Sequence, residues 1–331
     1  MGLKDFIMNM TGKKVSIVIC VYNRKDFIKK CLESVLSQTY QHTSIIVIDD
    51  GSNDGTAEIL ESFKENEKIH IHRNVQNLGL MVSRNLGAAM TDSEIVAYLD
   101  SDCIAEPNWL EELIKPFTES NDIVITGGKI NDPSPCNYWQ IVMLGNNFLA
   151  HKSGYIHKII GCNMAFRRTF LLNNRFDETL KYGGDETDLC MRVCTTGLKI
   201  YYQDSAKVTH HHRNRFASLA KQRFLTGVGN YYVRLKNGVF PFVSIKSLVL
   251  LVGCLFLALG PIFSSTFYWA GIFFFLYAGR VLFENYRPKR KSLVELVFSF
   301  PGKLLLTIIE DMGYIYGIFY VAGLKLGSHK S

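Results

Sequence analysis

The start of the chain lacks the features of a secretory signal. Residues 1–14 show no basic start followed by an apolar run and a small-residue cleavage site. Phe6 stands where a myristoylation pattern after Gly2 requires Ser or Thr. The sequence also contains no internal repeat, low-complexity stretch or long linker. We therefore expect the large N-terminal part to stay in the cytoplasm.

Paired cysteine spacings are missing as well. The eight cysteines stand singly in a chain of 331 residues, which is large enough to form a core without disulfides. Cys190 and Cys194 are one helical turn apart, but two ligands alone make a poor metal site. We predict reduced thiols that mostly serve core packing.

A nucleic-acid-binding surface is not indicated either, because no basic stripe is interleaved with exposed aromatic residues. The net charge of +7 is modest and partly gathered at residues 289–291 and around His210. Anionic lipid headgroups and a diphosphate substrate would explain this charge.

Apolar residues make up 47% of the chain and are concentrated near its end. Segments 247–263 and 267–283 each approach membrane-spanning length and show no polar face, which disfavours the alternative of two buried helices in a soluble domain. Basic residues flank both ends, so a transmembrane hairpin would have both ends in the cytoplasm. Glu310 and Asp311 interrupt the stretch 293–326, for which we expect interfacial or re-entrant helices. The sequence thus predicts an integral membrane protein with a cytoplasmic catalytic domain, 1–240, and a membrane region, 241–331.

Short apolar runs alternate with helical patterns in the first part of the chain. Strands are expected at 15–21, 45–48, 69–71 and 95–99, with helices around 27–35, 56–64 and 80–90 between them. This alternation predicts an α/β fold with a mainly parallel sheet and helices on both faces.

Acidic residues follow two of these strands. Asp49 and Asp50 end the second strand, and Asp100 and Asp102 follow the fourth. Ligands of open parallel sheets bind beyond the carboxyl ends of the strands, so we expect the four carboxylates at one edge. Asp100 and Asp102, with Ser101 between them, suit a hard cation such as Mn²⁺ or Mg²⁺.

Asp50 precedes a tight turn and offers hydrogen-bond acceptors to a nucleotide base. The alternative for Asp49 and Asp54 is that they cap the helix starting near Thr56, and for Asp54 this alternative is favoured.

Five segments in this order resemble family 2 glycosyltransferases with a GT-A fold: VSIVICVYNR, VIDDGSNDGT, YLDSDC, IIGCNMAFRR and GGDETDLCMR. The resemblance covers about residues 15–235. It implies a nucleotide-diphosphate sugar donor, a Mn²⁺ or Mg²⁺ ion, and inversion at the anomeric carbon. Cys20 departs from the proline often found in the first motif.

The resemblance also implies site residues. The metal ligands would be Asp102, Asp100 and His210, although His210 alternatively belongs to a solvated loop. Contacts to the nucleotide sugar or the acceptor would come from Val21, Tyr22, Asp49, Asp50, Asn77, Arg84, Asp100, Ser101, Gly161 and Asn163.

A base is needed to accept the proton of an acceptor hydroxyl. Asp185 and Glu186 open an expected helix, 185–196, closed by Gly197, where the positive end of the helix dipole favours carboxylates. Many relatives read Glu-Asp here, so Glu186 occupies the position of the base with a longer side chain. Which of the two acids is the base stays open, as does the alternative that both only cap the helix.

The expected function is transfer of a hexose to a hydroxyl of a lipid-linked glycan or another membrane-associated saccharide, in the synthesis of cell-surface polysaccharide or glycoconjugates. The Q-x-x-R-W signature of processive synthases is absent, since Arg223 directly follows Gln222. The alternatives are a polyprenyl-phosphate sugar synthase, which needs no base, and an inactive membrane scaffold.

Overall fold

The computed structural model describes residues 13–144, 152–180, 183–239 and 293–327, with single positions between 252 and 279. The chain divides into two compact units. The first comprises Met1–Pro133, Asn147–Lys181 and Asp185–His211, and the second comprises Ser134–Asn146, Tyr182–Gly184 and His212–Ser331.

A parallel half-sheet begins the first unit, as predicted. Its strands lie in the order β3-β2-β1-β4, and β1 pairs in parallel with both β2 and β4. The connecting helices are close to the predicted ranges. The elements are β1 (Val15–Val21), α2 (Ile28–Leu36), β2 (Thr43–Asp49), α3 (Thr56–Glu61), β3 (Ile69–Arg73), α4 (Leu80–Ala89) and β4 (Ile95–Leu99).

The other half of the sheet is mixed, which corrects the expectation of a mainly parallel sheet. Strand β8 is antiparallel to both β4 and β6, while β9 is parallel to β6 and antiparallel to β5 and β7. Buried strands read as apolar runs whatever their direction, so the sequence pattern did not reveal the change. These strands are β5 (Cys103–Ala105), β6 (Ile123–Asn131), β7 (Gly154–Ile156), β8 (Asn163–Arg167) and β9 (Lys199–His210).

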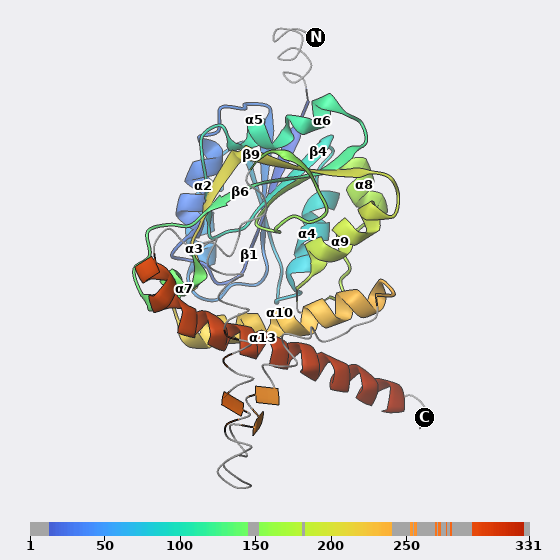
Figure 1. Ribbon diagram of the computed structural model, residues 1–331. Coiled ribbons are helices and arrows are strands. Elements are labelled where there is room, and N and C mark those ends of the chain that lie inside the picture. Colours follow the sequence, from blue (N-terminus) through green and yellow to red (C-terminus); the bar gives the residue numbers. More distant parts are fainter. Residues whose placement is uncertain are drawn as a thin grey trace. The chain divides into compact units, whose positions relative to one another are not determined.

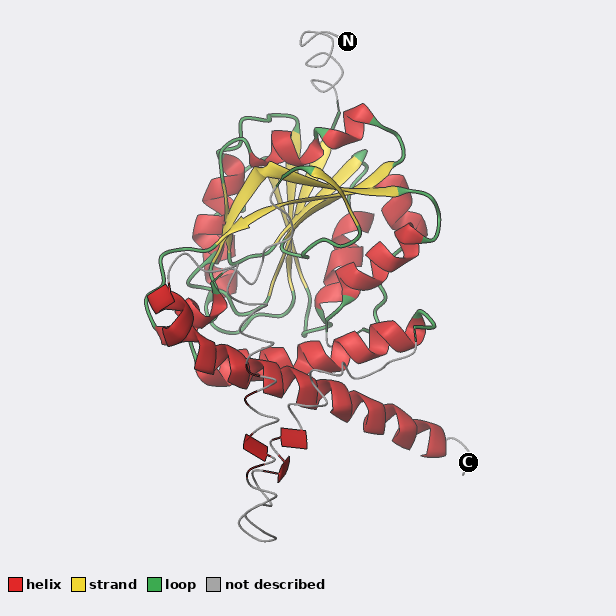
Figure 2. Cartoon of the chain, viewed as in Figure 1, coloured by secondary structure: helices red, strands yellow, loops and turns green. Residues whose placement is uncertain are grey.

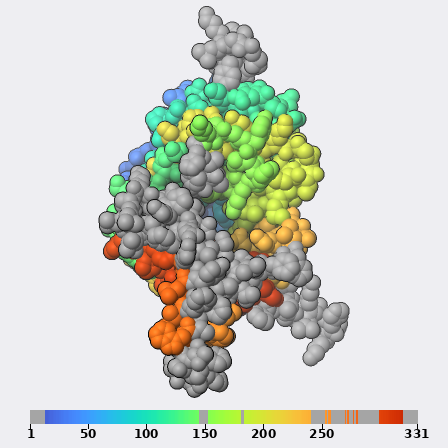
Figure 3. Space-filling view, viewed as in Figure 1, coloured from blue at the N-terminus to red at the C-terminus, as the bar shows by residue number. Residues whose placement is uncertain are grey.

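Helices cover both faces of this sheet (Figures 1 and 2). On one face α2 and α5 (Trp109–Ile114), followed by α6 (Pro116–Glu119), build a core around the fully buried Trp109. On the other face α4, α8 (Arg168–Asn173) and α9 (Asp185–Cys194) pack over Phe166 and Phe176. In the space-filling view, the yellow-green surface of the first unit comes from α8 and α9 (Figure 3). The sheet is therefore shielded on both sides, and its strand ends remain as the place for a site.

The second unit contains α7 (Tyr138–Met143), α10 (Phe216–Lys236) and α13 (Leu293–Gly327). Helices α10 and α13 touch through glycines. A Cβ on Gly227 would lie 1.9 Å from the carbonyl oxygen of Glu310, and one on Gly313 would lie 2.0 Å from that of Phe224. Only glycine permits backbones to approach this closely.

The prediction of an integral membrane protein is contradicted. Among the helices of the described residues, none has the length and hydropathy required to cross a bilayer. The stretch 293–326 forms one continuous helix, and Glu310 in its middle pairs with Arg223 of α10 at 3.3 Å. Hydropathy alone did not reveal this packing partner. The hairpin segments 247–263 and 267–283 lie outside the described residues, apart from single positions.

Candidate active site

The acidic residues meet at the carboxyl edge of the parallel strands, as the sequence predicts. Strand β2 ends at Asp49, and Asp100 directly follows β4. Strand β1 lies between them, with Val21 opposite Asp49. The topology therefore brings together two acidic pairs that are fifty residues apart in the chain.

Asp49 and Asp50 are both buried and both hydrogen-bonded within the fold. Asp49 Oδ1 accepts from the Ser52 backbone N–H at 3.0 Å, and Oδ2 lies 3.3 Å from Arg73 Nε. Asp50 accepts three hydrogen bonds of 2.8–2.9 Å, from the Asn74 side chain and from the backbone N–H groups of Leu78 and Gly79. Asp50 therefore fixes the loop that leads into α4.

Asp54 contacts the start of α3, although the N-cap residue of this helix is Gly55. Its Oδ1 accepts from the Thr56 backbone N–H at 3.0 Å, at the first residue of α3. Its Oδ2 accepts from the Lys25 N–H at 3.2 Å. Asp54 thus joins the start of α3 to the turn after β1.

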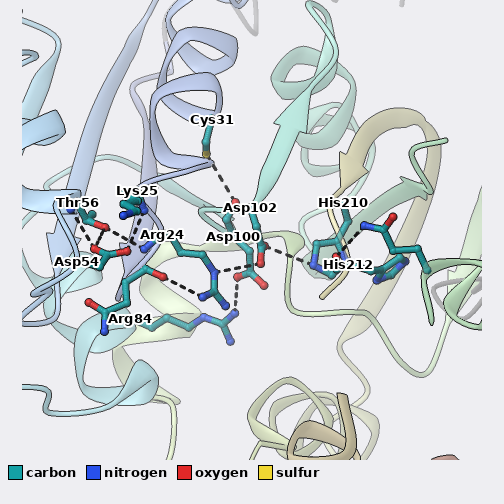
Figure 4. Close-up of polar contacts among 12 residues, drawn as sticks. Arg24, Lys25, Cys31, Asp54, Thr56, Arg84, Asp100, Asp102, His210 and His212 are labelled. Carbon is teal, nitrogen blue, oxygen red and sulfur yellow. Dashed lines mark hydrogen bonds and ion pairs between the residues drawn. The ribbon is translucent and has the colours of Figure 1, made fainter. Parts of the chain in front are cut away.

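Asp102 lies between two basic side chains (Figure 4). Its Oδ2 is 3.4 Å from Arg24 Nε, and its Oδ1 is 3.4 Å from His210 Nε2 at the end of β9. Burial favours the neutral acid, but His210 and Arg24 outweigh it and lower the pKa of Asp102 to about 2. Burial likewise opposes charge on the imidazole, but Cys162 and Asp102 raise the pKa of His210 to about 10.

The same side chains can hold a metal ion. The ligand atoms of Asp102, Cys103 and His210 all lie within 4.8 Å of one another. An ionised carboxylate suits Mn²⁺ and Mg²⁺, and the imidazole suits Mn²⁺ when metal binding displaces its proton. Burial keeps the pKa of Cys103 well above its usual value. Asp102 and His210 therefore fit the predicted divalent ion, and Cys103 is better suited to packing.

Arg84 of α4 links Asp100, at the end of β4, to Asp185, at the start of α9. Its buried guanidinium donates from Nη2 to Asp100 Oδ1 at 3.2 Å and to the Gly161 carbonyl at 3.0 Å, and from Nη1 to Asp185. Burial lowers the pKa of Arg84, but Asp185 and Asp100 more than compensate and raise it above its usual value. Burial raises the pKa of Asp100, an effect that Arg84 opposes and Asp102 reinforces.

Glu186 follows Asp185 in the first turn of α9 and is less buried. Burial and the neighbouring Asp185 raise the pKa of Glu186 to about 8, while Arg84 lowers it. A Cβ added to Gly161 would lie 3.1 Å from Arg84 Nη2 and 3.6 Å from Glu186 Oε2, so this glycine lets the backbone before β8 approach both side chains closely. A carboxyl group that titrates near neutral pH is suited to proton transfer.

The remaining predicted residues differ in their surroundings. Asn163 is engaged in the core, because its Nδ2 donates to the carbonyls of Lys129 and Ala206 at 3.0 Å and its Oδ1 accepts from Trp109 Nε1 at 2.8 Å. Val21 and Ser101 are buried at the strand ends, whereas Tyr22 and Asn77 are exposed at the same edge.

Two arginines of the site were missed by sequence reasoning. Arg24 pairs with Asp102, and Arg73 at the end of β3 pairs with Asp49. Both stand at or just after the end of a parallel strand, and that position is the signal that would have indicated them. Asn23, whose φ of +53° lies in the left-handed region that asparagine tolerates, makes the turn after β1 that precedes Arg24.

Comparisons with known proteins agree with this arrangement. Residues 16–175 match the family model described as Glycosyl transferase family 2. A glucosyl-dolichyl phosphate glucuronosyltransferase of Haloferax volcanii is 27% identical over 252 residues, which cover 70% of this chain and 80% of that protein. An uncharacterized glycosyltransferase of Haemophilus influenzae is 37% identical over 115 residues, 34% of this chain and 35% of that protein.

Among solved structures, the mannosyltransferase PcManGT from Pyrobaculum calidifontis, in complex with GDP-Man and Mn²⁺, superposes with a TM-score of 0.63. The match covers 88% of this chain and 87% of that one at 14% identity, which shows a shared GT-A-like fold. Residues 16–175 thus match the glycosyl transferase family 2 model, and with the glycosyltransferase relatives this match identifies the protein as a glycosyltransferase.

Proposed function

We propose that the protein transfers a sugar from a nucleotide-diphosphate donor to an acceptor hydroxyl, with inversion at the anomeric carbon. One observation carries the proposal. The Arg84 guanidinium donates to both Asp100 and Asp185. It therefore links the strand end that carries the Asp102–His210 pair to the helix start that carries Asp185 and Glu186. Sugar transfer requires this combination, because charge must be neutralised on the leaving diphosphate while a proton is removed from the acceptor.

The donor side is assigned to the sheet edge around Asp102. Asp102 and His210 would hold Mn²⁺ or Mg²⁺, with Asp100 beside them, and the bound ion would neutralise the charge of the departing diphosphate. PcManGT was solved with both a nucleotide sugar and Mn²⁺, which supports this assignment. The nucleoside is assigned to the edge formed by Val21, Tyr22 and Asp49, and the proposed contacts of Asn77, Ser101 and the buried Asp50 lie on the same edge.

The acceptor side is assigned to Glu186 at the start of α9. Its carboxylate would accept the hydroxyl proton while the oxygen attacks the anomeric carbon from the face opposite the leaving group. The bond from that carbon to the diphosphate oxygen breaks in the same displacement, and the nucleotide diphosphate leaves with the electron pair. Gly161 lets the backbone before β8 approach Arg84 and Glu186 closely, because it has no side chain.

The acceptor class is proposed from similarity. The relative in Haloferax volcanii carries glucosyl-dolichyl phosphate in its name, and it aligns with 70% of this chain. A saccharide linked to a polyprenyl lipid is therefore the proposed acceptor. A lipid phosphate acceptor would not need Glu186, so the requirement for this residue separates the two classes.

A donor screen tests the proposal. The purified chain is incubated with a panel of UDP, GDP and CMP sugars and Mn²⁺, and release of nucleotide is measured with and without EDTA. We expect hydrolysis of at least one nucleotide-diphosphate sugar that EDTA abolishes, and then transfer to a membrane lipid extract. The anomeric configuration of the product, read by proton NMR, tests inversion. Absence of hydrolysis for every donor, or activity that persists in excess EDTA, would contradict the proposal.

A further inference from the structure

The guanidinium of Arg84 is buried among polar and aromatic contacts. Only 3% of its side chain is exposed, and it faces Asp185, Asp100 and the Gly161 carbonyl. The rings of Tyr98 and Phe176 flank it, with centroids 5.9 and 5.5 Å from its central carbon. An arginine so enclosed has one orientation available.

Helix α4 is held close to the sheet where it carries Arg84. The Tyr98 hydroxyl donates to the Arg84 carbonyl at 2.9 Å. One turn further, a Cβ on Gly87 would lie 2.4 Å from a methyl group of Val18 on β1, so only glycine lets the helix approach. The backbone of α4 is thereby fixed against β1 and β4.

The carboxylate of Asp185 is engaged in a buried ion pair with Arg84. Asp185 is 4% exposed and its carboxylate faces Arg84. Loss of this contact would leave the Arg84 charge with less compensation in a buried place, which is costly. Glu186 hydrogen-bonds to the Asp185 side chain, and its Oε2 lies 3.6 Å from the place that a Cβ on Gly161 would take. The two acids at the start of α9 are therefore not equivalent.

We propose that Arg84 is a positioning residue for the transfer reaction, which holds Asp185 and Asp100 in place so that Glu186 alone receives the acceptor proton. This inference rests on the proposed function. In this role Arg84 would act through Asp185 and Asp100 and not by contact with the acceptor hydroxyl or the anomeric carbon. Its role is to orient the start of α9 relative to the strand end that carries Asp100 and Asp102.

The test compares Arg84→Lys and Arg84→Met with the parent chain. Lysine keeps the charge but lacks the planar group that donates to three acceptors at once. We expect kcat for transfer to fall about 10- to 100-fold in Arg84→Lys and further in Arg84→Met, with a smaller change in the KM for donor. Equal kcat and an unchanged pH profile in Arg84→Lys would overturn the inference even if Arg84→Met does not fold.

A second measurement does not depend on activity. In protein labelled with ¹³C at glutamate carboxyl groups, Glu186→Gln identifies the Glu186 resonance, and its titration is followed by NMR. The charged or titratable neighbours of Glu186 are Asp185 and Cys190 on its own helix and Arg84 from α4. We expect the Glu186 titration to move to higher pH in Arg84→Met, because the arginine charge lowers its pKa. An unchanged titration would overturn the inference, whereas a parent chain that hydrolyses no donor would overturn only the proposed function.

Discussion

Replacement of Asp50 by asparagine should destabilise the protein through the loop before α4. Both oxygens of Asp50 accept hydrogen bonds, Oδ1 from Asn74 and Leu78 and Oδ2 from Gly79, at 2.8–2.9 Å. An amide offers only one oxygen. Its NH₂ group must face at least one of these donors, which then loses its acceptor in a buried place.

The expected loss follows from these three contacts. A hydrogen bond to a charged group contributes about 1.5–3 kcal/mol, and a neutral one about 1 kcal/mol. Asp50→Asn removes one bond completely and makes the other two neutral, so the free energy of unfolding should fall by at least about 2.5 kcal/mol. The exposed Asp26 on the turn before α2 provides a matched control, and Asp26→Asn should change stability by less than about 0.5 kcal/mol.

Urea unfolding followed by circular dichroism measures both variants. The role of Asp50 as the anchor of this loop would be refuted if Asp50→Asn unfolded within about 0.5 kcal/mol of the parent and the control. In that case the proposed contact with the nucleoside would be the main role left for its carboxylate.

Four further predictions follow from the site and the helix packing. Asp102→Asn should weaken Mn²⁺-dependent nucleotide binding by at least about 100-fold in calorimetry. Glu186→Gln should lower transfer by about 10² to 10⁴ in a radiolabel assay while nucleotide binding persists. The pKa of His210 is raised from 6.5 to about 10, so protonated His210 should stabilise the fold fully below pH 6.5 and lose this effect as pH rises through 10. His210→Gln should therefore remove the fall in melting temperature between these pH values. Gly313→Ala should destabilise the contact between α10 and α13 by about 1–3 kcal/mol in thermal unfolding, whereas Gly154→Ala, with open space around it, should not.

The first half of the sheet was predictable because its signals are local. The runs at 15–21 and 95–99 coincide with β1 and β4, and each connecting helix fell between its strands. Strand direction after β5 was not predictable in this way. β8 runs antiparallel between β4 and β6 because of connections that span dozens of residues, and no short pattern encodes them.

The acidic part of the site was predictable for the same reason, since Asp49 and Asp100 stand at the ends of recognisable strands. Its basic part was not predicted in full. Arg84 and Asp185 are 101 residues apart, and only the folded sheet brings α4 against the start of α9. The resemblance placed Arg84 near the nucleoside or diphosphate, and the structure adds that its guanidinium faces Asp185 and Asp100.

The buried charges around Arg84 are better explained by function than by stability. A buried ion pair often contributes no more than apolar side chains of the same volume, because each charge loses its hydration. The interior around Tyr98 and Phe176 would accept such side chains, since both rings already pack there. Charge is nevertheless present at Arg84, Asp100 and Asp185. Asp100 lies two residues from the proposed metal ligand Asp102, and Asp185 directly precedes the proposed proton acceptor Glu186. Preorganised charges of this kind stabilise a transition state because they need not rearrange when charge develops. The same arrangement explains why Glu186, with a pKa of about 8, can differ in role from the acid that precedes it.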